Sequence, residues 1–384
     1  MSSELLFKFF FGLLIFTVIQ NVMTIFLIKK YRDKKDLKVD KKVSAPLSVL
    51  LPVKGPYEGI EQNLKSFFEQ QYAGKIEWVF AFQDGQDPCI PNVKKVSEEM
   101  KVPHIKILEG VKFIGLNPKN SNLTHAYLAS NGEWLLTIDI DCILPQGFIQ
   151  GMMDQTLNDP QQVVTTVPIH YGARNLWSCL ESIGTNVEMM NYFVSTFNFK
   201  KTGRPVYGGG LLFHRETGEK AGAFSEVYLN SLTEDAYMQG QFQQIGANIN
   251  LAHTAVETLM DHQTWSGYFK RYVRWLMIGK YFIAPLFYIT PLFWFAHWCL
   301  IAGLITMDRR LMLISFAFYF NRMVYACFVQ AVLRVPNEDI LKGLTIFIYD
   351  MLMPYLWLSA FFKRTVVWAG TTMAVKKKGR LVKV

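Results

Sequence analysis

Residues 132–144 read GEWLLTIDIDCIL, and this stretch decides the fold that we expect for the chain. Residues 134–138 form an apolar run of the kind that predicts a buried β-strand. Asp139 and Asp141 follow at its end. Because side chains alternate in direction along an extended chain, both carboxylates project to the same side. In parallel α/β sheets, ligands bind at the carboxyl ends of the strands, so this pair marks a candidate site.

The pair Asp139 and Asp141 allows two interpretations. Two carboxylates this close repel each other, so a cation is their natural neutraliser. Hard oxygen ligands favour Mg²⁺ or Mn²⁺, and such ions usually bridge to phosphates. The alternative is a solvated, Asp-rich turn, which is the commoner origin of an isolated DxD motif. The other motifs of the chain favour the metal site.

The composition indicates contact with a lipid bilayer. Of the 384 residues, 51% are hydrophobic and 15% are aromatic, which is rich for a soluble enzyme. The five cysteines show no zinc-like spacing, so we expect reduced thiols in a cytosol-facing protein. The net charge is +9, but the basic residues are clustered, and we expect no nucleic acid partner.

The N-terminal part predicts an anchor and a basic linker. Residues 9–28 are twenty residues without a charge, enough to span a bilayer, and too long for the apolar core of a signal peptide. Residues 29–42 then hold eight basic and three acidic side chains, which favours a cytoplasmic flank and suits anionic lipid heads. We therefore expect an anchor over 1–28 and a linker over 29–45. The protein is expected in the inner membrane if bacterial, or in the Golgi or ER if eukaryotic, with its catalytic domain on the cytoplasmic face.

Residues 46–265 predict one α/β domain. Apolar, strand-like runs alternate with segments of helical spacing, which is typical of a mostly parallel sheet with helices on both faces. The expected strands are 47–53, 76–82, 105–108, 134–138 and 163–168, and the expected helices are 61–71, 93–100, 121–130 and 236–244.

Two further motifs lie late in this domain. Gly208, Gly209 and Gly210 precede an apolar strand, and they allow either a close approach of the backbone to a ligand or a plain tight turn. Glu234 and Asp235 open a helical run, where a carboxylate is often only a cap or a partner of the helix dipole.

The C-terminal third predicts membrane-associated helices. Residues 266–280 form a basic amphipathic helix at the membrane interface, with Arg271 and Arg274 three residues apart and so on one face. Residues 281–362 form a membrane region with three apolar segments, the first of them broken by prolines and expected to be interfacial or re-entrant. Arg322 and Asp350 lie within the other two segments, where charges are costly, so we expect them to pair. Residues 363–384 are a tail with seven basic side chains and no acidic one.

Four pieces in order now resemble a known family. Together they are similar to the D, D, D, (Q/R)xxRW series of family-2 and family-21 type inverting glycosyltransferases, and more closely to the ceramide glucosyltransferase group and its bacterial lipid-glycosylating relatives. The pieces are Asp84/Asp87, Asp139/Asp141, Glu234-Asp235 and Arg271 to Trp275. Further matches are Pro52 to Gly55, Asn63-Leu64 with Ser66 to Phe68, Gln83 to Pro88, Asn117 to Lys119 with Asn122-Leu123, and Val367-Trp368.

The resemblance implies a GT-A-like (Rossmann-like) fold and a hexosyl transfer from a nucleotide-sugar, UDP-glucose or another UDP-hexose, to a membrane lipid such as a ceramide-like acceptor. Asp139 and Asp141 would hold Mn²⁺ or Mg²⁺, and Asp235 would be the general base. Arg271 and Arg274 would hold the diphosphate, and Trp275 would wall the acceptor site. The other implied substrate-binding residues are Asp84, Asp87, Lys119, Gly209, Gly210 and Glu234. For Lys119 the alternative interpretation is an ordinary surface lysine without a role in binding.

The chain also departs from the ceramide enzymes. They carry a histidine in a GTxH segment, where this sequence has Val187, and they lack the second aspartate of the DxD motif. The lipid acceptor therefore stays open. Three other classes share some of these features. A processive polysaccharide synthase usually has more membrane spans. The intact carboxylates argue against a non-catalytic membrane scaffold, and the large α/β domain argues against a transporter.

Overall fold

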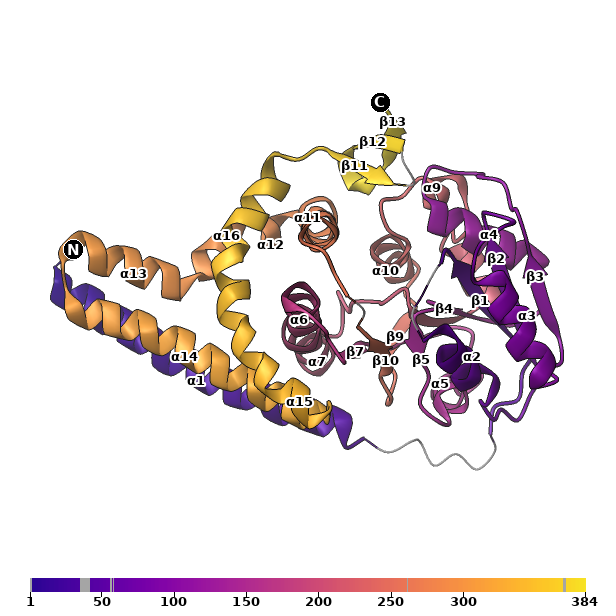
Figure 1. Cartoon of the computed structure of the whole chain (residues 1–384), viewed down its shortest axis with the longest axis horizontal. Coiled ribbons are helices and arrows are strands. Elements are labelled where there is room, and N and C mark those ends of the chain that lie inside the picture. The colour runs from indigo at the N-terminus through magenta and orange to yellow at the C-terminus, as the bar shows by residue number, and fades with distance from the viewer. Residues whose placement is uncertain (1, 35–41, 56, 58, 261, 369–370) are drawn as a thin grey trace. The chain divides into compact units, whose positions relative to one another are not determined.

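The computed structural model describes the chain except residues 1, 35–41, 56, 58, 261 and 369–370, and Figure 1 shows its path. Its contacts divide the chain into two compact units. The sheet unit comprises Lys34–Ile169, Thr196–Leu259 and Arg364–Val384, and the helical unit comprises Met1–Asp33, His170–Ser195 and Met260–Lys363. The central part of the expected linker, 35–41, lies outside the described residues.

The sheet unit is built on a seven-stranded sheet of order β3-β2-β1-β4-β8-β6-β9. Four neighbouring pairs are parallel and the two pairs that involve β8 are antiparallel, so the sheet is mostly parallel, as predicted. Its strands are β1 (Leu47–Val53), β2 (Ile76–Phe82), β3 (Ile105–Leu108), β4 (Trp134–Ile138), β6 (Gln162–Thr165), β8 (Gly210–His214) and β9 (Asn248–Leu251).

Helices cover both faces of this sheet. All seven residues of β1 are buried, because a central parallel strand is covered on both sides. Val49 and Leu51 join the core under α2 (Ile60–Phe68), α3 (Ile90–Glu99) and α5 (Phe148–Gln155). Leu50 points the other way, into the core under α4 (Pro118–Ala129) and α10 (Glu234–Gln244). The predicted α/β architecture is therefore confirmed.

The strand order places the candidate site. β1 is parallel to both β2 and β4, so the carboxyl ends of three neighbouring strands meet at one edge. Those strands end at Val53, Phe82 and Ile138, and the next residues include Asp84 and Asp139. The order of the strands reverses at β1, and such a reversal is where open α/β sheets bind their ligands.

Smaller elements complete the sheet unit. β5 (Cys142–Ile143) pairs antiparallel with β10 (Val256–Leu259) directly after the DxD motif. The tail, which the sequence predicts only as a basic segment, folds into a three-stranded antiparallel sheet. Its strands are β11 (Thr365–Trp368), β12 (Thr371–Val375) and β13 (Leu381–Lys383); the remaining helices are α8 (Arg215–Lys220) and α9 (Glu226–Leu229).

The helical unit contains three helices that are long and apolar enough to cross a membrane, among the residues that the structure describes. They are Ser3–Arg32, Arg309–Leu333 and Asn337–Phe362, and the first two, α1 and α14, run side by side (Figure 1). α11 (Trp265–Phe282) is bent by 118° against the next helices at Ile283, so the predicted break of the first apolar segment is confirmed. The other elements are β7 (Pro168–Tyr171), α6 (Leu176–Ile183), η1 (Gly184–Met189), α7 (Met190–Phe199), α12 (Ala284–Ile289), η2 (Thr290–Phe293), α13 (Phe295–Thr306), α15 (Asn337–Ile340), η3 (Leu341–Thr345) and α16 (Ile346–Phe362).

The expected intramembrane ion pair is present. Arg322 of α14 donates two hydrogen bonds to the carboxylate of Asp350, at 3.0 and 3.1 Å, and also binds Glu188 of the π-helical turn η1. No sequence pattern marks Glu188 as a partner of Arg322. The pairing offsets the free-energy cost of placing each charge among apolar side chains.

The contacts divide the chain differently from the expected continuous domain 46–265. His170–Ser195 packs with the apolar helices, because its helical turns bury Leu180, Ile183 and Val187 within that unit. Arg364–Val384 packs with the sheet unit, because it forms strands. A domain can therefore be built from three separate pieces of the sequence.

Candidate active site

Asp139 and Asp141 lie in the turn that joins β4 to β5. Both are partly exposed, whereas Ile140 between them is buried, so the two carboxylates lie on the solvent side as the alternation predicted. The turn is held from its buried side, because the Asn63 side chain donates to the carbonyl of Ile140 at 3.0 Å. Asn63 belongs to α2, and its amide therefore fixes the backbone between the two aspartates.

Lys119 joins two of the motifs. Its ammonium nitrogen lies 2.7 Å from Oδ1 of Asp139 and 2.7 Å from Oε1 of Glu234. Burial alone lowers the pKa of Lys119, but the two carboxylates outweigh burial and hold the pKa well above its usual value. The side chain is 24% exposed, so Lys119 is not the plain surface lysine of the alternative interpretation. The structure thus brings Lys119, Asp139 and Glu234 together.

Asp235 lies next to this cluster, in the first turn of α10. Its Oδ1 accepts hydrogen bonds from the backbone of Ala236, at 2.6 Å, and from the Thr233 hydroxyl. Burial, and then the charge of Glu234, raises the pKa of Asp235 to about 6. Thr233 is the N-cap residue of α10, but its side chain makes no capping hydrogen bond, so the Asp235 carboxylate also serves the first turn of the helix. A carboxylate with such a pKa is suited to accept a proton near neutral pH.

The glycine triplet is explained by close packing. A Cβ on Gly208 would lie 2.2 Å from Oε1 of Glu234, so only glycine leaves room for that carboxylate. A Cβ on Gly209 would meet the ring of Tyr207 at 2.7 Å, and one on Gly210 would meet the Thr166 methyl group at 2.1 Å. The need for glycine at 209 and 210 thus comes from neighbouring side chains, and a role in substrate binding stays a prediction.

Asp84 and Asp87 differ in their surroundings. Asp87 is 5% exposed, and its two oxygens accept from the backbone N–H groups of Gly55 and Cys89, both at 2.9 Å. It therefore ties the β2–α3 turn to the segment after β1. Asp84 is exposed, with one oxygen accepting from Gln86 at 2.9 Å. Of the two, Asp84 has the more accessible carboxylate for a ligand.

Two tyrosines near the aspartates were not found from the sequence. Burial, and then the charges of Asp141 and Asp139, raises the pKa of Tyr57. Burial raises the pKa of Tyr207 as well, with a contribution from the same two aspartates. Both phenols therefore stay protonated donors at the edge of the site. No motif marks them, because the tertiary fold alone brings them to the carboxylates.

The RxxRW segment lies on α11 of the helical unit. Arg271 forms an ion pair with Glu181 of α6, whose side chain is 2% exposed, while the Arg271 side chain is 40% exposed. Arg274 and Trp275 are partly exposed, and the Trp275 ring lies 5.5 Å from that of Tyr272. Glu181 was not expected from the sequence, and it holds the guanidinium of Arg271 from the buried side.

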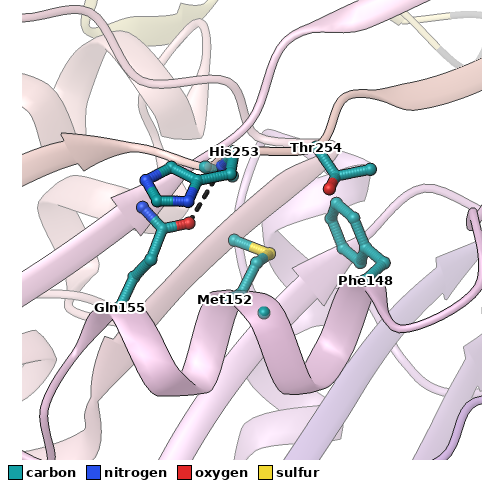
Figure 2. A pocket seen from close by; sticks show the side chains of 7 residues that line it. Phe148, Met152, Gln155, His253 and Thr254 are labelled. Carbon is teal, nitrogen blue, oxygen red and sulfur yellow. Dashed lines mark hydrogen bonds between the residues drawn. The ribbon is translucent and has the colours of Figure 1, made fainter. Parts of the chain in front are cut away.

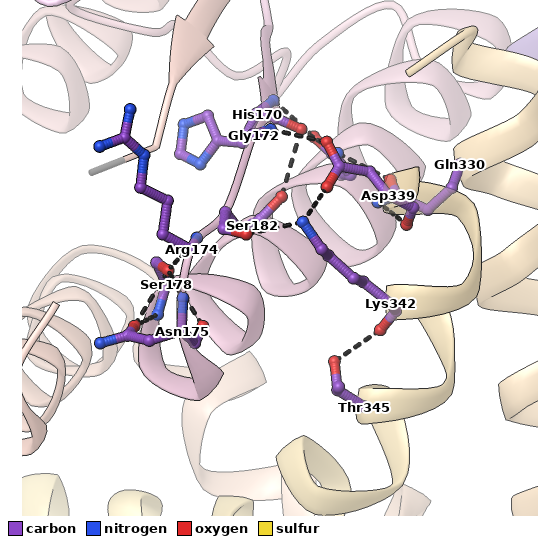
Figure 3. A network of polar contacts seen from close by, with 12 residues as sticks. His170, Gly172, Arg174, Asn175, Ser178, Ser182, Gln330, Asp339, Lys342 and Thr345 are labelled. Carbon is purple, nitrogen blue, oxygen red and sulfur yellow. Dashed lines mark hydrogen bonds and ion pairs between the residues drawn. The ribbon is translucent and has the colours of Figure 1, made fainter. Parts of the chain in front are cut away.

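A polar network fastens the loop that precedes α6. The Asp339 carboxylate accepts from the backbone of Gly172 at 2.6 Å and pairs with Lys342, which also donates to the carbonyl of Ala173 at 2.6 Å. Figure 3 shows the His170 imidazole pointing away from Asp339 and Lys342, while its backbone joins the network. The network connects the start of α6, which carries Glu181, to the turn before α16.

A small pocket lies elsewhere in the sheet unit. It is lined by α5 and by the segment after β9, including Phe148, Met152 and Thr254, and it encloses no space for a water molecule (Figure 2). The backbone of His253 donates to Gln155 at 2.9 Å across it. No predicted site residue lines this pocket, and it is too small for a sugar nucleotide.

The model of the family "Glycosyl transferase family 21" matches residues 12–381. The chain belongs to this family. The match covers both units, from the first apolar helix to the C-terminal sheet, and it confirms the family resemblance and the GT-A-like fold that the motifs implied. This family 21 chain is therefore a glycosyltransferase.

Curated relatives of the family 21 chain are ceramide glucosyltransferases. Ceramide glucosyltransferase 1 of Caenorhabditis elegans is 23% identical over 351 residues, which are 87% of this chain and 72% of that protein. Ceramide glucosyltransferase 3 of the same organism is 26% identical over 137 residues, 36% of this chain and 29% of that protein. Among solved structures, mannosyltransferase PcManGT from Pyrobaculum calidifontis, in complex with GDP-Man and Mn²⁺, has a TM-score of 0.49 at 13% identity and covers 93% of this chain and 97% of that chain.

The family 21 chain offers a limited donor set for a metal ion. Among the described residues, no group of three or more His, Cys, Asp or Glu side chains could hold one. Asp139 and Asp141 provide two carboxylates, and Mg²⁺ sites of phosphate-handling enzymes are commonly completed by substrate phosphates and water. Two hard oxygen ligands therefore fit Mg²⁺ or Mn²⁺ when a diphosphate is bound, with Lys119 competing for Asp139.

Proposed function

We propose that the chain is a membrane-bound, inverting hexosyltransferase that moves a sugar from a UDP-hexose to a hydroxyl group of a membrane lipid. The observation that carries this proposal is Lys119, which joins Asp139 and Glu234 beside Asp235. The carboxylates proposed to bind a metal, the cation Lys119 and the buried base Asp235 thus meet at the edge of the sheet where the parallel strands end. The distant ceramide glucosyltransferase relatives support a ceramide-like acceptor.

Donor binding rests on charge. Asp84 accepts hydrogen bonds from the base or ribose of the nucleotide, and Arg271 and Arg274 bind the diphosphate. Asp139 and Asp141 would hold Mn²⁺ or Mg²⁺, which neutralises the charge that develops on the leaving diphosphate. Lys119 adds a further positive charge beside Asp139.

Asp235 is the proposed general base. With a pKa of about 6, most of its carboxylate is ionised at neutral pH and ready to take a proton from the acceptor hydroxyl. The hydroxyl oxygen attacks the anomeric carbon as the bond to the diphosphate breaks, and the proton goes to Asp235. One direct displacement inverts the configuration of the sugar, and no nucleophilic carboxylate is required.

The apolar helices support a membrane lipid as the acceptor. Three described helices are long and apolar enough to span a bilayer, which suits a lipid substrate and opposes a soluble one. Val187 replaces the histidine of the ceramide enzymes, so the headgroup need not be that of ceramide. The basic linker supports a catalytic domain on the cytoplasmic face.

The direct test is a product assay. Purified protein is incubated with a panel of UDP-sugars and a membrane lipid extract, and the products are identified by mass spectrometry. A new glycolipid, absent with the Asp139→Asn/Asp141→Asn variant, supports the proposal. A soluble or polymeric product would contradict the lipid acceptor, and a polymer would favour a processive synthase.

A further inference from the structure

The C-terminal sheet, β11 to β13, buries one set of apolar side chains. Val366, Met373, Val375 and Leu381 are buried, although they come from three short strands at the end of the chain. β12 pairs antiparallel with both β11 and β13. A basic segment without a structural role would not bury this set of side chains, so the sheet is an ordered part of the sheet unit.

This sheet is bonded to the segment that leads into the proposed base. The backbone N–H of Leu232 donates to the carbonyl of Gly379 at 2.8 Å, and that of Leu381 donates to Asn230 at 2.7 Å. Between them, Ser231 and Arg380 form an antiparallel bridge. Only Thr233 separates Leu232 from Glu234 and Asp235.

The same segment is held from its other side by α4. Asn117 donates its side-chain amide to the carbonyl of Ser231 at 2.9 Å, and Asn120 donates to Tyr228 at 2.6 Å. Asn117 is the N-cap residue of α4 and lies two positions before Lys119. The residues that precede Glu234 are therefore clamped between the helix that carries Lys119 and the C-terminal sheet.

The C-terminal sheet carries a cluster of exposed basic residues. Lys376, Lys377, Lys378, Arg380 and Lys383 are all exposed. No acidic residue occurs between residues 363 and 384 to neutralise them. Only Lys363 and Arg364 separate β11 from Phe362, the last residue of a helix long enough to cross a membrane. The three residue steps from Phe362 to Thr365 span no more than about 11 Å, so β11 begins close along the chain to the end of that helix.

We propose that the exposed basic residues of the C-terminal sheet bind the anionic headgroups of membrane lipids and that this binding orders the segment carrying Glu234 and Asp235. Clustered cations beside a membrane helix favour an anionic surface. Because Leu232 donates to Gly379 and Leu381 donates to Asn230, holding the sheet also holds the segment. The residues of the sheet are positioning residues, and their effect on turnover rests on the proposed function.

The test compares nanodiscs of phosphatidylcholine alone with nanodiscs that also contain phosphatidylglycerol. Hydrogen–deuterium exchange is followed in peptides that cover residues 228–236 and 376–384. Wild-type protein should exchange more slowly in both peptides when the anionic lipid is present. With a transferred sugar identified, kcat should rise in the same nanodiscs while the KM for the donor stays constant.

The variant is Lys376→Gln/Lys377→Gln/Lys383→Gln, which removes three charges, keeps most of each side-chain stem, and leaves the Arg380 bridge intact. Its matched control is Lys65→Gln/Lys94→Gln/Lys95→Gln, which removes three exposed cations from α2 and α3. The first variant should weaken the sheet's affinity for the anionic surface on the order of 10²-fold and so lose the lipid response. The control should keep it.

The possible outcomes are distinct. A lipid response that survives in the first variant, or is lost equally in the control, overturns the proposal. So does protection of peptide 376–384 in pure phosphatidylcholine on adding inorganic phosphate, since the cations would then bind a soluble anion. Unchanged exchange of the β12 amides in phosphatidylcholine shows that the variant is folded; a second variant, Lys376→Arg/Lys377→Arg/Lys383→Arg, should behave as wild type. If exchange responds but no sugar is transferred, the proposed function fails and the lipid-binding surface stands.

Discussion

Lys119 stands between two carboxylates that are 95 positions apart in the sequence, Asp139 and Glu234. Without its charge, these side chains and Asp235 would form a cluster of negative charge at the edge of a sheet. Burial, and then the charge of Glu234, already raises the pKa of Asp235 to about 6. The charge balance of the site therefore depends on how Lys119 is shared between Asp139 and Glu234.

Replacing Asp235 with Asn should lower kcat by about 10²- to 10⁴-fold, because general-base catalysis typically contributes that factor. Asparagine keeps the shape and can still accept from Ala236, so donor binding should survive, as measured by calorimetry with UDP. In wild type, kcat/KM should fall as the pH drops through about 6, because Asp235 is then protonated. Wild-type turnover in the Asp235→Asn variant would remove this residue from the mechanism.

The same substitution has an opposite effect on stability. The pKa of Asp235 is higher in the folded protein than its ordinary value of 3.8. Its contribution is therefore fully present at pH below that ordinary value and is lost as the pH rises through about 6. Asp235→Asn should raise the thermal unfolding temperature at pH 8, whereas at pH 4 the two proteins should differ less.

Replacing Lys119 with Met should destabilise the sheet unit and reduce turnover, because Asp139 and Glu234 would face each other without a cation. A charged hydrogen bond of this kind contributes about 1.5–3 kcal/mol. Denaturant unfolding measures the loss, and Lys119→Arg is the matched control that keeps the charge. Equal stability of the Met variant and wild type would show that the ammonium group is dispensable.

At the scale of elements, short segments hold the charged residues in place. The π-helical turn η1 brings Glu188 to Arg322, so the intramembrane pair is a cluster of one cation and two carboxylates. α6 brings Glu181 to Arg271. In both cases the arginine has a partner on a helix in which no sequence motif marks a charged site.

The cluster around Arg322 predicts an asymmetry. Arg322→Ala leaves two carboxylates together, whereas Asp350→Ala leaves Arg322 paired with Glu188, so the first variant should express and purify less well. Reversal of both charges, Arg322→Asp with Asp350→Arg, should rescue only in part because Glu188 then lies beside a carboxylate. Adding Glu188→Gln should improve the rescue. Yields of folded protein by size-exclusion chromatography measure this order, and full rescue by the double reversal would contradict it.

At the scale of the whole molecule, two compact units carry different tasks. The sheet unit holds the carboxylate cluster, and the helical unit holds the apolar helices and the RxxRW segment. Each unit is assembled from three separated stretches of chain. Removal of the last 20 or so residues would thus affect the unit of the active site and not only a tail.

The proposed reaction predicts a dependence on divalent metal. EDTA should abolish turnover, Mn²⁺ or Mg²⁺ should restore it, and Asp141→Ala should lose nearly all turnover while the protein stays folded. The Asp84→Ala variant is a useful comparison, since it should weaken nucleotide binding and leave the metal requirement unchanged. Full activity in EDTA would rule out this role of the aspartates.

The basic linker predicts the orientation. Protease added to sealed, right-side-out cells should leave the sheet unit intact, and the same protease should cut it after the membrane is opened. Immunoblots against an epitope placed after Val384 report the outcome. Cleavage in sealed cells would place the unit on the other side.

The sequence by itself determined the alternation of strands and helices, the aspartates after β4, the long apolar helices and the pairing of Arg322 with Asp350. These features depend on local periodicity, or on the high cost of a charge among apolar side chains. The tertiary structure alone decided that Lys119 bridges Asp139 and Glu234, that Glu181 and Glu188 reach the two arginines, and that the last strands clamp the segment before Asp235. Such contacts join residues far apart in the chain, and no local pattern of hydrophobicity or charge records which of them the folded sheet brings together.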